Sequence, residues 1–381
     1  MDYQKLFNSE EISSESVKAW KAQGKKALGV LCCHVPVEVL HALDIMPVRL
    51  RATGCTETPD GDAWMSTFSC SYARGILQYW ITGVYNELDG IVTSDGCMMP
   101  WRTFDNAEHI DKVNKKDRLY FQIGAPRVYS DYKDLGLEYY MTELKGLIAK
   151  LEEFSGNKLT DEKLKASIAK YNEARELVMK VYDLRKEKNP VISGEDTLKI
   201  TLAYSDVPVE EYIELLKAFL ADAKNRAPIT DKRARLMVIG SALDNPGYLK
   251  VIEDKGGLVV HDALCYGSRP FNYPVEVDDN NVLASVADYY LTRLVCPRMI
   301  DNRERMQQWI FDTAKEFNVD GVVYQKMQYC ECWGGEKMFL EPLLKEANIP
   351  MLIVDREEHL ANVGQLAIRA EAFIEMIEKE D

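Results

Sequence analysis

The chain has 381 residues, more than one hydrophobic core usually supports, so we expect two or three domains. Its 46% hydrophobic and 28% charged residues are typical of a globular protein, and its net charge of −14 argues against nucleic acid or an anionic membrane surface as a general partner. The N-terminus, Met-Asp-Tyr-Gln-Lys, shows no signal-peptide pattern and no apolar run is long enough to span a membrane, so we expect a cytoplasmic protein. Nine cysteines in such a chain indicate core thiols, metal ligands or both, rather than a disulfide framework.

Residues 1–136 are predicted to form an N-terminal α/β domain that includes a charged N-terminal helix at about 10–26. Short apolar runs predict its strands, at residues 27–33, 47–51, 89–97 and 119–123. Helical patterns lie between these runs. The alternation of strand and helix predicts a parallel sheet with right-handed crossovers and helices on both faces.

Residues 137–230 are predicted to form a helical segment between two sheet domains. From Leu137 onward, apolar residues recur at helical spacing, and no clear strand interrupts them. Thr160 is a suitable N-cap for the second of these helices, because Asp161 and Glu162 follow in its first turn. Pro190 and Gly194 break the pattern before a further helix begins.

Residues 231–381 repeat the first pattern and are predicted to form a second, related α/β domain. Its expected strands are at residues 236–240, 258–261, 319–324 and 351–354. Both domains contain a strand that begins with Asp-Gly, at Asp89 and at Asp320, and each of these strands leads to a cysteine. We therefore expect two related parallel-sheet halves with a helical insert between them.

Three cysteines occupy positions suited to a metal centre. Cys97 and Cys330 follow the two Asp-Gly strands, and loops after parallel strands are where such sheets bind ligands. Cys70 lies just before a predicted helix, where free N–H groups stabilise a thiolate. No close C-x-x-C spacing supports ligation, and a buried core thiol is the commoner role for each of them.

The remaining cysteines are weaker candidates. Cys332 is expected in an extended loop with its side chain opposite to that of Cys330, so that both would not bind one iron. Cys32 and Cys33 are expected in the core or in a pocket lining, and Cys296 against the adjoining helix. Cys55 is undecided, and Cys265, in the segment Cys-Tyr-Gly-Ser-Arg269, is the strongest of this group.

Other chemical signals are sparse. The five histidines show no paired ligand spacing, and no strand is followed by a Walker loop or a Gly-x-Gly-x-x-Gly motif. Several arginines at strand ends suit a bulky anionic ligand, with surface ion pairs as the alternative: Arg49, Arg51, Arg102, Arg127 and Arg269. Glu38 suits either an acid–base role or, more simply, a favourable charge at a helix N-terminus.

Taken together, four segments resemble the subunits of 2-hydroxyacyl-CoA dehydratases and the related benzoyl-CoA reductases, over essentially the whole chain. They are His34-Val-Pro-Val-Glu-Val-Leu-His-Ala-Leu-Asp-Ile-Met-Pro-Val-Arg49, Cys70-Ser-Tyr-Ala-Arg-Gly75, Cys265-Tyr-Gly-Ser-Arg269 and Gln328-Tyr-Cys-Glu-Cys-Trp-Gly-Gly-Glu336. In that family each of two related subunits holds a [4Fe-4S] cluster through three cysteines. The resemblance implies Cys70, Cys97 and Cys330 as the ligands here, with no catalytic residue identified; a flavin is possible in the family but is not indicated by the sequence.

The resemblance also implies a reaction, the elimination of water from an (R)-2-hydroxyacyl-CoA to the (E)-2-enoyl-CoA, as in anaerobic amino-acid fermentation. A separate ATP-dependent iron-sulfur activator supplies one electron, a ketyl radical forms on the thioester, and the electron is later recycled. An iron with an open position would act as a Lewis acid.

The length and the Cys-Tyr-Gly-Ser-Arg269 segment resemble the smaller, β-type subunit, which implies a heterodimer with an α-type partner. Cys32-Cys33-His34 and the second cysteine at position 332 depart from the usual pattern. Two alternatives stay open: an electron-relay or scaffolding subunit of the same or a benzoyl-CoA reductase-like complex, and an α/β protein with a structural zinc site.

Overall fold

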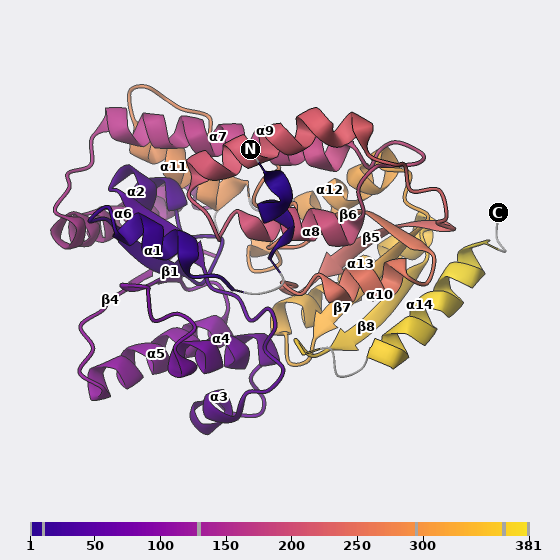
Figure 1. Cartoon of the computed structure of the whole chain (residues 1–381), viewed down its shortest axis with the longest axis horizontal. Helices are drawn as coiled ribbons and strands as arrows, with labels where there is room; N and C mark the ends of the chain where they lie inside the picture. The colour runs from indigo at the N-terminus through magenta and orange to yellow at the C-terminus, as the bar shows by residue number, and fades with distance from the viewer. Residues whose placement is uncertain (1, 10–11, 128–130, 294–295, 360–362, 379–381) are drawn as a thin grey trace.

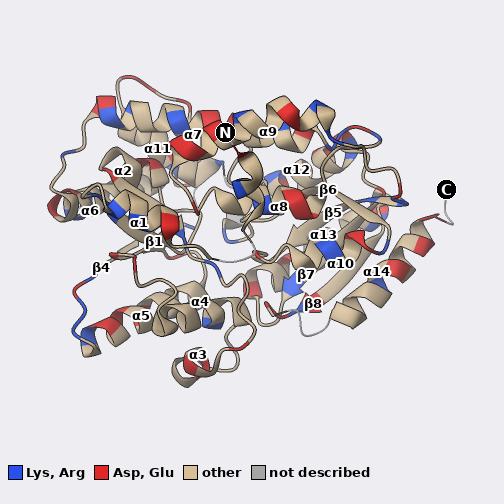
Figure 2. Ribbon diagram, in the orientation of Figure 1, with Lys and Arg blue, Asp and Glu red and all other residues tan. Residues whose placement is uncertain are grey.

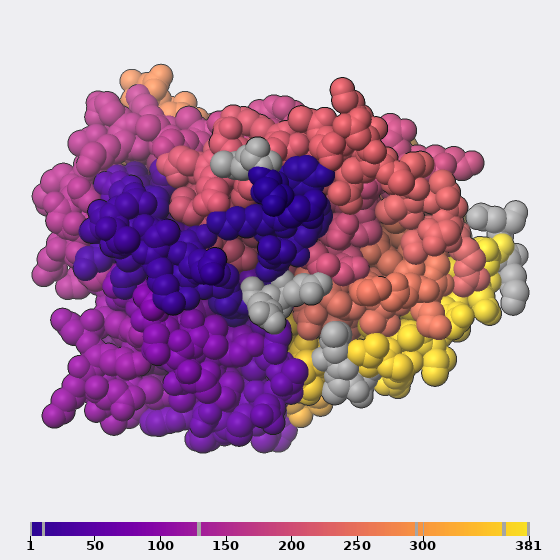
Figure 3. Space-filling model, in the orientation of Figure 1, coloured from indigo at the N-terminus to yellow at the C-terminus, as the bar shows by residue number. Residues whose placement is uncertain are grey.

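A computed structural model describes residues 2–9, 12–127, 131–293, 296–359 and 363–378. Two four-stranded parallel sheets form the two halves of the molecule, and a layer of helices runs along both (Figure 1). In the space-filling view the N-terminal half meets the C-terminal half along one seam, and the helical layer covers the upper edge of both (Figure 3). The predicted α/β class and the helical stretch between two sheet domains are confirmed. The domain boundaries at 136 and 230 remain predictions.

The N-terminal sheet has the strand order β2-β1-β3-β4, and all neighbouring pairs are parallel. Its strands are β1 (Lys26–Val30), β2 (Ile45–Arg49), β3 (Gly90–Ser94) and β4 (Leu119–Ile123). The helices of this half are α1 (Glu15–Lys21), α2 (Val37–Ala42), α3 (Pro59–Trp64), α4 (Ser71–Thr82) and α5 (Met98–Val113). The expected N-terminal helix is shorter than predicted: a 3₁₀ helix, η1 (Tyr3–Phe7), precedes α1, and residues 10–11 lie outside the described residues.

The C-terminal sheet repeats this topology with the order β6-β5-β7-β8. Its strands are β5 (Ala234–Gly240), β6 (Gly257–Ala263), β7 (Gly321–Met327) and β8 (Met351–Arg356). Its helices and 3₁₀ turn are α10 (Gly247–Glu253), α11 (Val282–Thr292), η3 (Ile300–Asn302), α12 (Arg303–Glu316), α13 (Glu331–Glu346) and α14 (Val363–Glu378). The equal order of the two sheets confirms the expected internal repeat.

The repeated Asp-Gly pair has the same structural role in both halves. The carboxylate of Asp89 accepts a hydrogen bond from the N–H of Ala27 at 2.9 Å, and that of Asp320 accepts one from the N–H of Arg235 at 2.6 Å. Each carboxylate thereby satisfies a backbone donor at the start of the neighbouring central strand. Gly90 is required as well, because its φ is +150° and a Cβ there would lie 1.9 Å from the carbonyl oxygen of Leu119.

The helical layer contains α6 (Lys133–Ser155), α7 (Asp161–Asp183), α8 (Gly194–Ala203), α9 (Val209–Asp222) and a 3₁₀ turn, η2 (Ala223–Asn225). Thr160 caps α7 as predicted, since its hydroxyl accepts a hydrogen bond from the N–H of Lys163. Although α11 follows the second sheet's first strands in the chain, its residues share an apolar core with α6 and the N-terminal sheet. The C-terminal part of the chain thus crosses back onto the N-terminal half.

Charged side chains of both signs are interspersed along the outer helices α7 and α9 (Figure 2). Pairs one helical turn apart are typical, such as Lys180 with Glu176 at 2.7 Å. Within the described residues, no helix combines the length and apolar character needed to cross a lipid bilayer.

Candidate functional site

The three predicted ligand cysteines occupy the same local position in the fold. Cys70 is the N-cap of α4, Cys97 is the N-cap of α5, and Cys330 is the N-cap of α13. Cys97 and Cys330 follow the carboxyl ends of β3 and β7, the equivalent strands of the two sheets. Each thiol therefore lies beside unpaired helix N–H groups, which favour a thiolate or an anionic group bound to it.

These thiols line one cavity between the two sheets, which we call the cysteine cavity. It has a volume of about 130 Å³, and its wall includes eight of the nine cysteines. The eight are Cys32, Cys33, Cys70, Cys97, Cys265, Cys296, Cys330 and Cys332. Cys55 is the exception: it is buried elsewhere, with its sulfur 3.3 Å from the carbonyl oxygen of Glu57.

The expectation for Cys332 was wrong. The segment after Cys330 is the first turn of α13 instead of an extended loop, and the Gly-Gly pair at 334–335 lies inside this helix. Trp333 is buried in the turn and fixes it against Tyr324, whose hydroxyl donates to the Trp333 carbonyl at 2.5 Å. Cys332 consequently points to the same cavity as Cys330 and forms a hydrogen bond with Cys97.

Cys296 was expected to pack against the adjoining helix, but it lines the cysteine cavity beside Arg269. Cys32 and Cys33 line the cavity, which agrees with the prediction of a pocket lining.

Burial and mutual contact change the acidity of the thiols. Burial raises the pKa of Cys70 to about 12, and the nearby Cys330 acts in the same direction. The hydrogen bond between Cys97 and Cys332 raises the pKa of Cys97 and lowers that of Cys332 to about 7. A hydrogen bond from Cys33 lowers the pKa of Cys32 to about 7. Cys70 and Cys330, far apart in sequence, line the same cavity.

The loops that carry Cys97 and Cys330 are held by the buried side chains of Arg298 and Ser241 and by Asp95, whose side chain is 26% exposed. The carboxylate of Asp95 pairs with the guanidinium of Arg298 and accepts from the N–H of Ala125 at 3.0 Å. Ser241, at the end of β5, accepts from the N–H of Met327 at 3.0 Å and also contacts the Cys330 thiol. These contacts position the two cysteines from opposite sheets.

The Cys265 loop is built around Asp262. Its carboxylate accepts from the N–H groups of Leu264 at 3.1 Å and Ser268 at 2.8 Å, and from the hydroxyl of Tyr182 at 2.5 Å. Gly267 allows the loop to close, since a Cβ there would lie 2.0 Å from Asp262 Oδ1. The glycine and serine of the segment Cys-Tyr-Gly-Ser-Arg269 are therefore needed to form this loop, and the loop places Cys265 at the cavity.

The donor set suits a multi-iron group better than a single ion. Within the described residues, no three His, Cys, Asp or Glu side chains are grouped so as to hold one metal ion. A structural zinc site requires such a group, whereas each thiolate of an iron-sulfur cluster binds its own iron. The thiols are spaced around a largely apolar cavity, which is compatible with the second arrangement.

The five arginines that the sequence suggested for an anionic ligand lie in different environments. Arg51 is buried and forms an ion pair with Asp206 at 2.8 Å, and the exposed Arg102 lies 3.3 Å from Asp105. Arg127 is exposed. Of these five arginines, Arg49 and Arg269 line the cysteine cavity.

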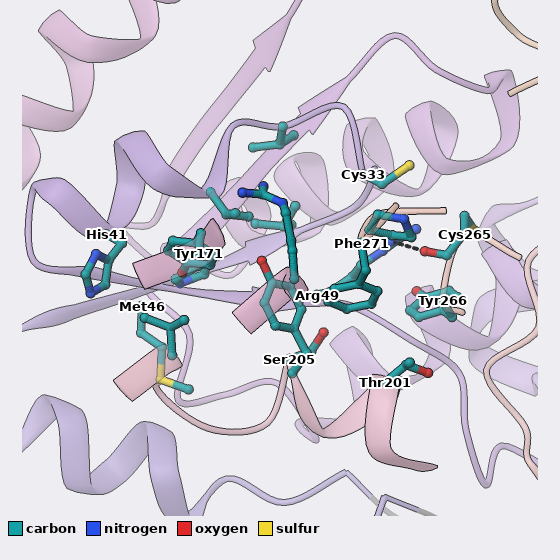
Figure 4. A pocket seen from close by; sticks show the side chains of 18 of the residues that line it. Cys33, His41, Met46, Arg49, Tyr171, Thr201, Ser205, Cys265, Tyr266 and Phe271 are labelled. Atoms are coloured by element: carbon teal, nitrogen blue, oxygen red, sulfur yellow. Dashed lines mark hydrogen bonds between the residues drawn. The ribbon is translucent and has the colours of Figure 1, made fainter. Parts of the chain in front are cut away.

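A second cavity adjoins the cysteine cavity on the side of the helical layer, and we call it the arginine pocket (Figure 4). Four residues, Cys32, Cys33, Arg49 and Cys265, line both cavities. Next to it Glu38 is fully buried, pairs with Arg175 and accepts from the hydroxyl of Tyr290 at 2.8 Å. Its carboxylate is thus a buried ion-pair partner, and not merely a favourable charge at a helix N-terminus.

Sequence reasoning missed Ser241 and Arg298, and it did not anticipate that so many thiols would meet. Both residues lie in segments without a recognisable motif. A signal was available for Ser241, because it directly follows the predicted strand that ends at Gly240 and loops after parallel strands form ligand sites.

The chain is similar in sequence to several known proteins. The family described as "2-hydroxyglutaryl-CoA dehydratase, D-component" matches residues 32–377. One of the subunits of the benzoyl-CoA reductase of Thauera aromatica is 25% identical over 97% of this chain and 95% of its own length. The (R)-phenyllactyl-CoA dehydratase beta subunit of Clostridium sporogenes is 23% identical, over 98% of this chain and 99% of its own length. The beta subunit of the (R)-2-hydroxyglutaryl-CoA dehydratase of Acidaminococcus fermentans is 24% identical over 94% of each chain.

The family match spans most of the chain and includes every cysteine of the cavity, so the chain belongs to the 2-hydroxyglutaryl-CoA dehydratase D-component family.

Proposed function

We propose that the chain is a β-type subunit of an (R)-2-hydroxyacyl-CoA dehydratase, which eliminates water to give the (E)-2-enoyl-CoA by a ketyl radical route after one-electron activation. The observation that carries the proposal is the meeting of three N-cap cysteines from two related sheets at one thiol-lined cavity, in a member of this family.

In this proposal Cys70, Cys97 and Cys330 hold a [4Fe-4S] cluster. When bound, the cluster supplies one-electron chemistry and an iron with an open position for Lewis-acid contact. The chain's own residues orient the ligand cysteines and keep water away from the site. Asp95 with Arg298, and Ser241, fix the cysteine loops, while the apolar wall excludes water, which strengthens electrostatic interactions in the site.

The partner is proposed to be a related α-type subunit, because several relatives are named as beta subunits of dehydratases. Exposed large side chains adjoin all three ligand cysteines: Phe68 is 71% exposed, Met98 51% and Tyr329 40%. Phe68 and Tyr329, from opposite halves of the molecule, contact each other with ring centroids 5.6 Å apart. An apolar rim of this kind suits burial against a second subunit.

The electron must come from outside the chain. No nucleotide-binding loop was found in the sequence, yet reduction of a thioester requires a strong reductant, so we propose a separate ATP-dependent iron-sulfur activator. The acyl group and any flavin are not part of the proposal.

The test is reconstitution of the chain, co-expressed with an α-type partner and purified without oxygen. We expect no dehydration of (R)-2-hydroxyacyl-CoA by the heterodimer alone. Activity should appear with reduced activator and Mg-ATP, and activator far below stoichiometric amounts should support many turnovers. Steady dehydration without activator or ATP would overturn the radical route.

A cluster-free β-type chain in the same complex separates a catalytic role from an electron relay. If the substrate binds at this chain's cluster, the loss should abolish both substrate binding and turnover. If only turnover is lost and substrate binding to the complex is unchanged, the relay role replaces the catalytic one.

A further inference from the structure

The arginine pocket lies where the N-terminal sheet, the helical layer and the Cys265 loop meet. Its volume is about 50 Å³, which is room for about four water-sized groups. In Figure 4, His41, Met46 and Tyr171 lie on one side of the pocket and Cys33, Cys265 and Tyr266 on the other. The pocket therefore extends from the helical layer to the wall that it shares with the cysteine cavity.

Three arginines line this pocket, and their charges are not balanced. Arg175 is matched by the buried carboxylate of Glu38. Within the described part of the chain, Arg49 and Arg293 form no ion pair with a carboxylate; they donate to the carbonyl oxygens of Cys265 at 2.6 Å and Pro270 at 3.1 Å. Arg293 is only 6% exposed, and the buried Nε atoms of both residues have no hydrogen-bond partner.

Tyrosine rings reduce the cost of this excess charge but do not remove it. The Arg293 guanidinium lies 3.1 Å from the centroid of the Tyr289 ring, and that of Arg49 lies 4.1 Å from the centroid of Tyr266. Burial and the charge of Arg175 lower the pKa of Arg293 well below its ordinary value. A buried cation without an ion-pair partner is destabilising, and Glu38 is already paired with Arg175, so the pocket favours an additional anion.

The charges of all three arginines act on the phenol of Tyr204, which lines the pocket. Burial and the Glu38 carboxylate raise the pKa of the Tyr204 phenol, and the charges of Arg175, Arg293 and Arg49 all oppose this increase. Tyr204 is thus within electrostatic reach of all three guanidinium groups. The surrounding wall is apolar and aromatic, with Val35, Val37 and Phe271 among its residues.

We propose that the arginine pocket binds the carboxylate of a short organic acid, with Arg49 and Arg293 as its charge partners and the carbon chain against the apolar wall. A guanidinium donates charge-assisted hydrogen bonds to a carboxylate, and both arginines line the pocket. The small volume suits a carboxylate with one or two carbons. The site is independent of the proposed dehydration, because binding requires neither partner nor activator.

The experiment measures binding of propionate to the full chain, purified without oxygen, by titration calorimetry and by the shift in thermal midpoint at constant ionic strength. Propionamide, which has the same shape without the charge, is the control ligand, and sulfate is the control anion. We expect propionate to bind and to raise the midpoint, and propionamide and sulfate to have no effect. Equal effects of propionate and propionamide, no effect of propionate, or binding of sulfate alone would overturn the assignment.

Variants locate the site. Arg293→Met should weaken propionate binding at least ~10-fold, and Arg293→Lys should weaken it less, because the charge remains while the fork is lost. Arg369→Met, an exposed site on α14, should bind as the unaltered chain does. Without ligand, Arg293→Met should unfold at the same or a higher temperature, since it removes an unmatched buried charge. If it does not fold, the half-buried Arg49→Met carries the same test; unchanged affinity in that variant, or in Arg293→Met, would overturn the location.

Discussion

Arg298, from the segment after α11, forms an ion pair with Asp95, two residues before Cys97 on the opposite half of the chain. The guanidinium is 5% exposed and also donates to the carbonyl oxygen of Ala125 at 2.7 Å. The contact fixes the loop between β3 and α5 and joins it to the C-terminal half. The placement of Cys97 therefore depends on residues about 200 positions away in sequence.

Arg298→Met should break this pair and leave the Asp95 carboxylate without its cation. We expect a loss of about 2 kcal/mol in the free energy of unfolding, because Asp95 loses a charge-assisted partner while solvent reaches only 26% of its side chain. Urea unfolding followed by circular dichroism measures the change. Arg102→Met removes an exposed pair with Asp105 and should cost less than ~1 kcal/mol. Equal effects of the two substitutions would show that the Arg298 contact contributes nothing particular.

Glu253 should make stability depend on pH. Burial raises the pKa of this carboxyl from 4.5 to about 7, although it accepts from the N–H groups of Gly194, Glu195 and Val259. Because its pKa in the folded state is the higher one, its contribution is fully present below pH ~4.5 and is lost as the pH rises through ~7. The contribution of Glu253 to the free energy of unfolding follows from the shift in its pKa and is on the order of 3 kcal/mol.

Glu253→Gln is the matched variant, since an amide cannot titrate. The free energy of unfolding of the unaltered chain should fall relative to that of the variant between pH 4.5 and 7. Parallel pH profiles of the two proteins would contradict the burial argument.

The apolar rim near the ligand cysteines should carry the proposed contact between subunits. Phe68→Ala and Tyr329→Ala each remove an exposed aromatic side chain at this rim, and each should weaken heterodimer association about tenfold or more. Sedimentation of the co-expressed chains gives the affinity. Ile368→Ala on α14 is the control, because its side chain is 70% exposed and lies on the outer face of the C-terminal half. Should Ile368→Ala weaken association as strongly as Phe68→Ala, the rim is not the interface.

The two-sheet fold could be predicted because its signals are local. The buried parallel strands are continuous apolar runs in the sequence, as around Val238 and Val323. The Asp-Gly pair recurs because each Asp carboxylate accepts a hydrogen bond from a backbone N–H at the start of the neighbouring strand. The return of α11 onto the N-terminal half could not be predicted, because its apolar face fits any complementary core and the sequence does not say which.

The candidate site was only partly predictable for the same reason. Cys70, Cys97 and Cys330 were identifiable from the ends of strands and the starts of helices, which are local features. Cys332 was expected in an extended loop, but burial of Trp333 and Leu340 against the second sheet stabilises a helix there. Cys296 and Arg298 reach the cavity only once the two halves meet, and no local pattern encodes that meeting.

Iron and sulfide content of chains purified without oxygen tests the central claim most directly. The unaltered chain should carry about four irons with the brown absorption of a [4Fe-4S] cluster near ~400 nm. Cys70→Ser, Cys97→Ser and Cys330→Ser should each lose most of this iron, whereas Cys55→Ser, which alters the one cysteine outside the cavity, should retain it. Full iron content in the Cys330→Ser chain would contradict the account.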